Sequence, residues 1–338
     1  MASGAARQLR LVVGLSDFPD RCRKRLESLA PQIEVAYIAD ELVSDLEDPD
    51  VEALVAATTP NLDRVPRLRW LQVPSAGVDR LVESAPWERL IVTNARGVYA
   101  VPMAEYVLGA ALAASQQMES RRALQKARRW PDSGVPYESL GLRGRTMVIV
   151  GYGAVGRETA RQAATFGMTV LAVKAHPNQR VENGSFREPG SGDPDGTIPD
   201  RIFGSDALED VARLADFLVI TAPLTARSRG LVSQRVLDAL PKHAWLINVG
   251  RGALVDETAL LELLQSGRLA GAALDVFAKE PLEGDSLFWS LPNVVVTPHV
   301  SGGAPNNWDV LTDLICENLK RWVSDEPLLN LVDAGRQY

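Results

Sequence analysis

The chain has 338 residues, of which 46% are hydrophobic and 23% charged, and its formal net charge is −7 at pH 7. This composition is typical of a folded globular protein, and the length suits two domains of roughly 150 residues each. The acidic balance argues against nucleic acid as a partner. Cys22 and Cys316 are too few for a disulfide framework or a cysteine-rich zinc site. No segment is apolar for long enough to suggest a signal peptide or a membrane span, so we expect a cytoplasmic protein. We also expect no bound metal.

Short runs of apolar, often β-branched residues alternate with helix-period segments, which predicts parallel sheets with helices on both faces. The first series of expected strands is Leu11–Leu15, Glu34–Ile38, Ala53–Ala57, Leu68–Val73 and Leu90–Thr93. The second series is Met147–Val150, Thr169–Val173, Phe217–Thr221, Ala244–Val249, Ala272–Val276 and Val294–Thr297. The expected fold class is α/β, with two doubly wound, Rossmann-like parallel-sheet domains and a cleft between them.

Three further segments bear on the domain organisation. A long helix is expected over Val101–Arg129, and its apolar early part predicts burial between domains or subunits. The segment Val181–Arg201 is rich in Gly, Pro and acidic residues without periodicity, which predicts a long surface loop. A last helix, Pro305–Trp322, follows the final strand and is expected to return to the first domain, which would then be discontinuous.

A glycine run, Gly151-Tyr152-Gly153-Ala154-Val155-Gly156, directly follows one expected strand and opens a helix. In this context the run predicts a dinucleotide site. Gly151 permits a tight turn, Gly153 lets the backbone approach a pyrophosphate, and Gly156 allows close helix–strand packing. The phosphates would then lie at a helix N-terminus. The simpler interpretation is a glycine-rich turn, but the flanking strand and helix favour the dinucleotide site.

The end of the next strand bears on the choice of coenzyme. An NAD site usually places Asp or Glu there to accept from the ribose hydroxyls. Lys174 occupies that position, and His176 and Arg180 follow it. A cation attracts a 2′-phosphate and cannot accept hydrogen bonds. We therefore expect NADP to be preferred to NAD; a simple surface charge or use of both coenzymes are the alternatives.

Polar residues follow three successive strands of the second series: Arg251, then Asp275 with Glu280, then His299. In a doubly wound sheet these strand ends face one crevice. Arg251 can hold a carboxylate bidentately and polarise a ketone, and His299 can donate a proton. Glu280 can fix the imidazole tautomer and favour its protonated form. Each residue alone has an ordinary explanation as a loop residue or ion pair; together they suit hydride transfer to a 2-oxo acid.

These blocks resemble the D-isomer-specific 2-hydroxyacid dehydrogenase family, which includes glyoxylate and hydroxypyruvate reductases. The similar blocks are Gly151–Gly156, Thr221–Thr225, Asn248–Gly252, Ala273–Phe277, Thr297–His299 and, more weakly, Ser75–Asp79 and Thr93-Asn94. The resemblance implies that Arg251, Glu280 and His299 are the catalytic trio, with Arg251 and His299 also contacting the substrate. It implies that Ala76 and Gly77 bind the substrate carboxylate through backbone N–H groups. The positions expected to bind the coenzyme are Gly151, Gly153, Ala154, Val155, Gly156, Lys174, Ala222, Pro223, Val249, Gly250, Asp275 and Gly302.

The sequence departs from the family at three places. Lys174 replaces the usual acidic residue, Arg96 stands where relatives often have Pro, and the segment Val181–Arg201 is longer than in most relatives. The departures bear on the adenosine side of the site more than on the chemistry.

The expected function is hydride transfer between NAD(P)H and a small 2-oxo acid, giving a D-2-hydroxy acid, with glyoxylate and hydroxypyruvate as first candidates. A dinucleotide-sensing binding protein of the corepressor kind is the alternative on the same fold. The expected domains are a flavodoxin-like substrate-binding domain, 1–98 plus 304–338, and a dinucleotide-binding Rossmann domain, 99–303. The resemblance also implies a homodimer formed through Val101–Trp130.

Overall fold

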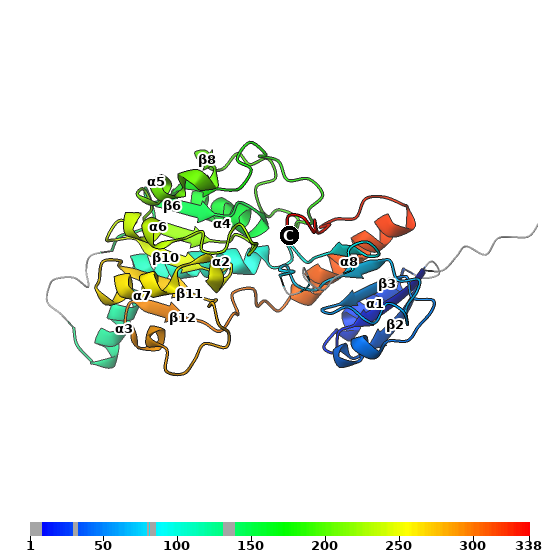
Figure 1. Ribbon diagram of the computed structural model, residues 1–338. Helices are drawn as coiled ribbons and strands as arrows, with labels where there is room; N and C mark the ends of the chain where they lie inside the picture. Colours follow the sequence, from blue (N-terminus) through cyan, green and yellow to red (C-terminus); the bar gives the residue numbers. More distant parts are fainter. Residues whose placement is uncertain (1–8, 30–32, 80, 82–85, 131–138) are drawn as a thin grey trace, which may run out of the picture. The chain divides into compact units, whose positions relative to one another are not determined.

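The computed structural model describes residues 9–29, 33–79, 81, 86–130 and 139–338 (Figure 1). The chain forms two compact units, which are described here one at a time. Unit 1 comprises Met1–Tyr99, Asn183–Pro189 and Ala304–Tyr338, and unit 2 comprises Ala100–Glu182 and Gly190–Gly303. Among the described residues, every helix is too short or too polar to cross a membrane.

Unit 1 is built on a five-stranded, all-parallel sheet with the order β2-β1-β3-β4-β5, the flavodoxin-like order. Its strands are β1 (Leu9–Gly14), β2 (Ile33–Ile38), β3 (Ala53–Ala56), β4 (Trp70–Gln72) and β5 (Ile91–Thr93). Its helices are α1 (Asp20–Glu27), the 3-10 helix η1 (Asp40–Asp45) and α8 (Asn307–Val323).

Both faces of this sheet are buried, because successive side chains of a strand point to opposite faces. On one face Leu11 and Val13 pack in a cluster with Leu26 of α1 and Leu314 of α8. On the other face Val12 lies in a second cluster, which also includes strand residues of β3, β4 and β5. Helix α8, drawn in orange-red beside α1 and β3 in Figure 1, thus completes the core of unit 1 although it follows unit 2 in the chain.

Unit 2 contains a seven-stranded, all-parallel sheet with the order β12-β11-β10-β9-β6-β7-β8. Its strands are β6 (Thr146–Val150), β7 (Thr169–Val173), β8 (Arg201–Phe203), β9 (Phe217–Ile220), β10 (Trp245–Asn248), β11 (Gly271–Leu274) and β12 (Val294–Val296). Counted from β6, this is the Rossmann order 3-2-1-4-5-6 with one more strand at the edge. The order reverses between β6 and β9, the place where such sheets bind ligands.

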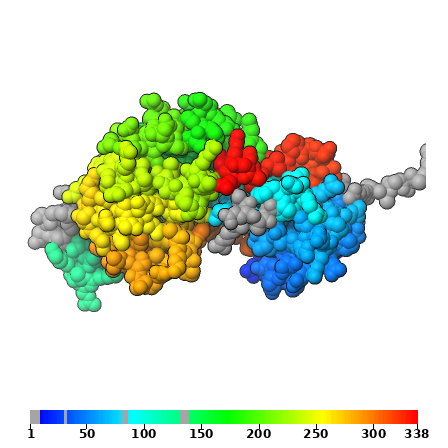
Figure 2. All heavy atoms as spheres, viewed as in Figure 1, coloured from blue at the N-terminus to red at the C-terminus, as the bar shows by residue number. Residues whose placement is uncertain are grey.

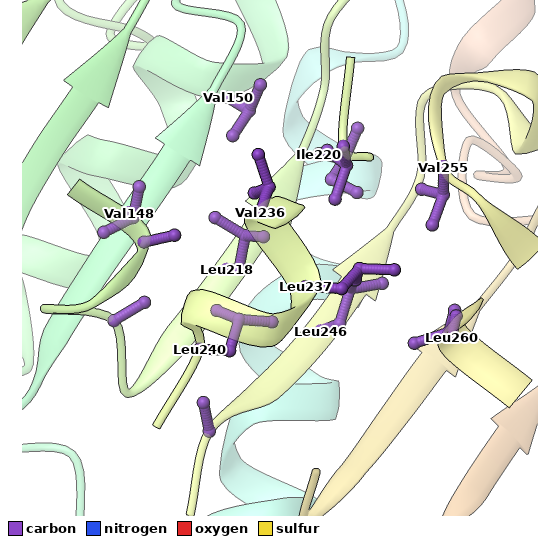
Figure 3. Close-up of a cluster of buried hydrophobic side chains, with 14 of the residues drawn as sticks. Val148, Val150, Leu218, Ile220, Val236, Leu237, Leu240, Leu246, Val255 and Leu260 are labelled. Carbon is purple, nitrogen blue, oxygen red and sulfur yellow. The ribbon is translucent and has the colours of Figure 1, made fainter. Parts of the chain in front are cut away.

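Helices cover both faces of this sheet. They are α2 (Ala100–Ser115), α3 (Met118–Lys126), α4 (Ala154–Thr165), η3 (Ser205–Ala207), α5 (Leu208–Ala212), α6 (Gln234–Ala239), η4 (Gly252–Leu254), α7 (Glu257–Gln265) and η5 (Leu287–Ser290). Helices α2 and α4 pack together on one face, with Val107 and Ala160 against Ile149. Helices α5, α6 and α7 pack on the other, where Leu237 and Leu260 meet the alternate strand residues such as Leu218 (Figure 3).

The structure confirms two parallel-sheet α/β units, and it corrects the helix expected over Val101–Arg129. Two helices form there, because α2 ends at Ser115 and Gln117 adopts a left-handed conformation with φ +50°. The carbonyl oxygen of Ser115 accepts from the N–H of Leu140 at 3.0 Å, so the returning chain takes an acceptor that a continuous helix would use. The cleft between the units remains a prediction.

The segment predicted to be a loop over Val181–Arg201 has more structure than the sequence indicates. Its last residue, Arg201, begins β8, and Ser191 and Asp193 are buried although most of its other residues are exposed or half-buried. Residues 183–189 belong to unit 1 and the flanking residues to unit 2. The green surface at the top of Figure 2 includes part of this segment.

Candidate active site

The glycine run lies between β6 and α4, as the motif requires. Gly151 has φ +101°, and a Cβ built on it would lie 2.4 Å from the backbone nitrogen of Ala222. A Cβ on Gly156 would lie 2.2 Å from the carbonyl oxygen of Gly151, so both positions need glycine. Gly153 is the N-cap of α4, and a Cβ there would meet nothing within 4 Å. The N-terminus of α4 is therefore open at the residue where a pyrophosphate is expected, and its N–H groups fit an anion.

The other expected coenzyme positions after β9 and β10 gather beside this run. The hydroxyl of Thr221 donates to the carbonyl oxygen of Gly151 at 2.6 Å. A Cβ on Gly250 would lie 3.0 Å from the carbonyl oxygen of Ala222, and the N–H of Val249 donates to Ile220 at 3.2 Å. Pro223 directly follows Ala222. The ends of β6, β9 and β10 thus form one packed edge next to the N-terminus of α4.

Lys174 directly follows β7 and lies close to the same edge, since Gly151 N–H donates to the carbonyl oxygen of Val173 at 2.8 Å. Its side chain is half-buried, and Nζ donates to the carbonyl oxygen of Gln179 at 2.7 Å. Burial, followed by the positive charge of Arg157, lowers the pKa of Lys174. This lysine is therefore held at the end of β7 rather than extended into solvent.

The end of β10 carries Arg251 in a turn fixed by Asn248. The Asn248 side chain donates from Nδ2 to the carbonyl oxygen of Arg251 at 3.1 Å and accepts from Gly250 N–H at 3.1 Å. Arg251 is partly buried, and its Nη1 donates to the carbonyl oxygen of Gly250 at 2.9 Å. A Cβ on Gly252 would lie 1.9 Å from the carbonyl carbon of Phe277, so the chain after β10 packs directly on the chain after β11.

Asp275, directly after β11, is a fully buried carboxylate that organises the loop after β12. It accepts from the hydroxyl of Thr297 at 2.6 Å, from Val300 N–H at 2.9 Å and from Ser301 N–H at 2.9 Å. Its own carbonyl oxygen accepts from His299 N–H at 2.8 Å. Asp275 therefore holds the backbone on both sides of His299. Gly302 follows directly in the same loop.

His299 itself has φ +56°, a left-handed conformation that costs a residue other than glycine roughly 1–2 kcal/mol. Its Nδ1 lies 2.8 Å from Oε2 of Glu280, and the other oxygen of Glu280 accepts from Phe277 N–H at 3.0 Å. Because an ionised carboxylate only accepts, Nδ1 carries the proton and Nε2 is left for another partner. The His299 side chain is 49% exposed, and no described residue hydrogen-bonds Nε2. The arrangement presents Nε2 of an oriented imidazole to solvent.

In unit 1, the turn 74–77 follows β4 and shows an asymmetry in its backbone hydrogen bonds. Each of its four successive carbonyl oxygens accepts a hydrogen bond; the donors are Tyr99 Oη (2.6 Å), Ala95 N (2.9 Å), Asn94 Nδ2 (2.9 Å) and Ser75 Oγ (2.8 Å). The N–H groups of Ala76 and Gly77 have no acceptor among the described residues. A turn with satisfied carbonyls and open N–H groups suits a carboxylate.

The sequence prediction missed the residues that hold this turn. Asn94 is itself held by Asn330, which is fully buried with φ +59° and donates from Nδ2 to the carbonyl oxygens of Asn94 at 2.9 Å and Arg96 at 2.7 Å. The Asn330 oxygen accepts from Phe186 N–H at 2.8 Å. Asn94 lies in a recognised block and could have been found there. Asn330 lies 236 positions from Asn94 and 144 from Phe186, and nothing in the sequence pattern indicates these contacts.

In unit 2, Tyr106 on α2 and Thr297 were also missed. Their hydroxyl oxygens lie 2.8 Å apart, and Thr297 donates onward to Asp275, so α2 is tied to the loop that carries His299. The other two histidines lie elsewhere. His243 lies just before β10 and contacts Asp216 at 3.0 Å, at the amino ends of the strands. His176 is exposed.

The structure thus brings the predicted residues of unit 2 to the carboxyl ends of the strands in the seven-stranded sheet. Arg251, Asp275 and His299 follow the neighbouring strands β10, β11 and β12, and Glu280 contacts His299 directly. The predicted Ala76 and Gly77 belong to unit 1.

Comparison with known proteins agrees with the family resemblance seen in the sequence. The model of the family "D-isomer specific 2-hydroxyacid dehydrogenase, NAD binding domain" matches residues 108–301. Glyoxylate reductase of Thermococcus litoralis is 30% identical over 295 residues, which cover 84% of each chain. D-3-phosphoglycerate dehydrogenase of Methanocaldococcus jannaschii is 28% identical over 312 residues, and the match spans 89% of this chain but 55% of that longer protein.

A solved structure is similar over nearly the whole chain. NADPH-dependent glyoxylate/hydroxypyruvate reductase of Sinorhizobium meliloti, in complex with NADP and sulfate, has a TM-score of 0.78 and is 27% identical. The match covers 98% of this chain and 100% of that one.

Proposed function

Because the chain belongs to the D-isomer specific 2-hydroxyacid dehydrogenase family, we propose that it reduces a small 2-oxo acid to the D-2-hydroxy acid. Glyoxylate and hydroxypyruvate are the proposed first substrates, since relatives named as reductases of these acids match most of the chain. The observation that carries the proposal is the His299–Glu280 pair at 2.8 Å, in which Nε2 of the imidazole is presented to solvent.

The proposed catalytic residues are Arg251, Glu280 and His299. Protonated His299 donates from Nε2 to the carbonyl oxygen of the substrate, while Glu280 accepts from Nδ1–H and stabilises the positive charge. Arg251 binds the substrate carboxylate and polarises the carbonyl group. The open N–H groups of Ala76 and Gly77 are proposed to bind the same carboxylate.

The proposed coenzyme site is the open N-terminus of α4 with the packed edge formed by Gly151, Ala222 and Gly250. Pro223, Val249, Asp275 and Gly302 follow the neighbouring strands and are proposed to line the same site. The coenzyme, when bound, supplies the hydride. The cationic Lys174 in the position of the usual acidic residue supports a preference for NADPH over NADH.

A sensor without turnover is not favoured. The two reductases cited above are named as enzymes, and an oriented imidazole and a guanidinium after strands of the same sheet serve no purpose that binding of a dinucleotide alone requires.

We further propose a substrate-binding domain of residues 1–98 plus 304–338 and a coenzyme-binding domain of residues 99–303. A homodimer through Val101–Trp130 is proposed because Met118 and Trp130 are exposed, with 54% and 88% of their surface accessible. Light scattering of the purified protein tests it: a monomer contradicts it.

The proposed partner is a small acid rather than nucleic acid, and the proposed place is the cytoplasm, since both cysteines are free thiols.

Steady-state kinetics on a panel of 2-oxo acids with NADPH and NADH tests the main proposal. We expect turnover above about 1 s⁻¹ with glyoxylate or hydroxypyruvate. Chiral chromatography should identify D-glycerate as the product from hydroxypyruvate. Turnover below about 1 s⁻¹ across the panel would contradict the enzyme and support the sensor.

A further inference from the structure

Residues 174–200 connect β7 to β8 on the adenosine side of the sheet, and the reaction described above does not use their structure. The glycine run opens the crossover from β6 through α4 to β7, and this connection is the next crossover. It lies next to the place where a dinucleotide places its adenosine ribose. We call residues 174–200 the adenosine segment. It contains Lys174 together with the exposed His176 and Arg180.

Three buried side chains anchor the adenosine segment to the glycine run and to α4. Tyr152 Oη donates to Oδ2 of Asp193 at 2.6 Å, and Glu158 accepts from Gly192 N–H at 2.6 Å. Arg157 donates to the carbonyl oxygen of Asp193 and, at 2.5 Å, to that of Arg180. Tyr152, Arg157 and Glu158 are 2%, 3% and 0% exposed. The segment is therefore fixed to the phosphate-binding motif by side chains that water does not reach.

Arg157 is a buried charge, and its partners show what it holds. Its guanidinium lies 4.9 Å from the centre of the Tyr152 ring, and its Nε lies 3.1 Å from Oε2 of Glu182. A buried guanidinium is unfavourable unless carbonyl and carboxylate oxygens surround it, and here two carbonyl groups and one carboxylate do so. An apolar side chain of similar size would fill the space but could not hydrogen-bond the carbonyl oxygens of Asp193 and Arg180. The guanidinium therefore holds two parts of the segment at once and pairs with Glu182.

Arg157 also acts on the charges beside it. Lys174 lies within the electrostatic reach of Arg157, whose charge lowers the pKa of the lysine, while Glu182 opposes this effect. Two cations therefore share one carboxylate, and Arg180 and His176 add positive or protonatable groups on the exposed side. An anion at the end of β7 is attracted to the positive charges of Lys174 and Arg180.

Lys174 and Arg157 also hold the turn formed by residues 176–180. Lys174 Nζ donates to the carbonyl oxygen of Gln179 at 2.7 Å, and Arg157 binds the next carbonyl oxygen, that of Arg180. Gln179 N–H closes the turn onto His176 at 3.1 Å. Both carbonyl oxygens thus face cations of the protein, and negative ends of peptide dipoles are kept away from an incoming phosphate.

We propose that Arg157 is a positioning residue that makes the site select a coenzyme with a 2′-phosphate on its adenosine ribose. It fixes the turn 176–180 and, with Lys174, supplies the positive field that this phosphate meets. The proposal rests on the proposed function, because it concerns the coenzyme that the reaction uses. It also gives a specific role to the adenosine segment, most of which lies within the stretch Val181–Arg201 that is longer than the resemblance implies.

Isothermal titration calorimetry on the full-length protein tests the proposal without any turnover. NADP⁺, NAD⁺, 2′,5′-ADP and 5′-ADP are titrated into the wild-type protein, Arg157→Met, and Arg235→Met as a matched control on an exposed arginine. We expect the Kd of NADP⁺ and 2′,5′-ADP to rise at least ~10-fold in Arg157→Met, because two charge-assisted hydrogen bonds are lost. The Kd of NAD⁺ should change less than ~3-fold in either variant. An equal loss of NADP⁺ and NAD⁺, or no loss of NADP⁺, overturns the proposal.

Arg157→Lys keeps the charge but not the planar fork, and it provides the test if Arg157→Met does not fold. We expect an intermediate loss of NADP⁺ affinity with unchanged NAD⁺ affinity, and wild-type affinity for both overturns the proposal. The failures remain distinguishable. A wild-type protein without 2-oxo acid turnover that still loses NADP⁺ selectively in Arg157→Met contradicts the proposed activity and supports this inference. A wild-type protein that binds NAD⁺ as tightly as NADP⁺ overturns both the coenzyme preference and this inference.

Discussion

In unit 2, the reactive end and the adenosine segment's residues 174–182 and 190–200 belong to the same sheet domain, but they are held in different ways. At the reactive end, formed by the loops after β10, β11 and β12, the contacts join neighbouring strand ends, as when Asp275 binds the backbone of Val300 and Ser301. The adenosine segment is held by buried side chains of α4 that reach far along the chain, as Arg157 reaches Asp193. The proposed chemistry and the proposed coenzyme choice therefore rest on separate contacts. Substitutions at one end should therefore leave the other unchanged.

The largest expected effect is that of His299→Ala. The substitution removes the proposed proton donor, and general acid catalysis contributes roughly 10²–10⁴-fold, so kcat should fall at least ~10²-fold. Stopped-flow or steady-state assays with glyoxylate measure it, and calorimetry should find the NADP⁺ affinity within ~2-fold of wild type. Near-normal kcat would remove His299 from the proposed mechanism, and a parallel loss of NADP⁺ affinity would break the separation of the two ends.

Arg251→Lys should follow. Lysine keeps the charge but cannot form the bidentate fork, and hydrogen bonds to a charged group contribute about 1.5–3 kcal/mol. We expect kcat/KM for the 2-oxo acid to fall about 10- to 100-fold, with unchanged NADP⁺ affinity. Unchanged KM and kcat would show that Arg251 does not bind the carboxylate in this way.

At the adenosine segment, Asp193→Asn should weaken coenzyme binding without changing the chemistry. Asp193 accepts from Tyr152 Oη, from Thr197 N–H at 3.1 Å and from Ile198 N–H at 3.1 Å, so an amide NH₂ must face a donor. Leaving such a group unpaired costs about 1–3 kcal/mol, which predicts a lower urea midpoint and an NADP⁺ Kd raised about 5-fold. The control is Asp285→Asn, an exposed aspartate. A lower kcat at saturating NADPH would contradict the separation of the two ends.

The smallest effect concerns pH. Burial and the charge of Arg157 lower the pKa of Lys174, so its ammonium loses its proton at a lower pH than an ordinary lysine. The protonated form attracts the 2′-phosphate, and NADP⁺ affinity should therefore fall as pH rises from about 7 to about 9.5, by about 3-fold relative to NAD⁺. Fluorescence titration of both coenzymes measures the ratio, and Lys174→Met should abolish its pH dependence. A ratio that changes identically in wild type and variant would assign the effect to another group.

Much of this architecture could be predicted from local sequence. The alternation of apolar strands and helix-period segments predicted two parallel sheets, and the structure confirms them. The glycine run and the polar residues Arg251, Glu280 and His299 were also visible, because a motif and its chemistry occupy a few consecutive positions. Their proposed roles await the experiments above. The break of the helix at Gln117 was not visible, since no Gly or Pro marks it and the cause is the returning chain at Leu140.

The sequence by itself determined the strands other than β8, where a pyrophosphate is expected and which side chains follow the strand ends, because backbone conformation and apolar periodicity are local properties. Only the tertiary structure decided that Arg157 is buried, that Asp193 anchors the adenosine segment and that Asn330 holds the turn around Ala76. The physical reason is that a buried polar group is stable only with partners. Folding brings those partners from positions that no local pattern connects.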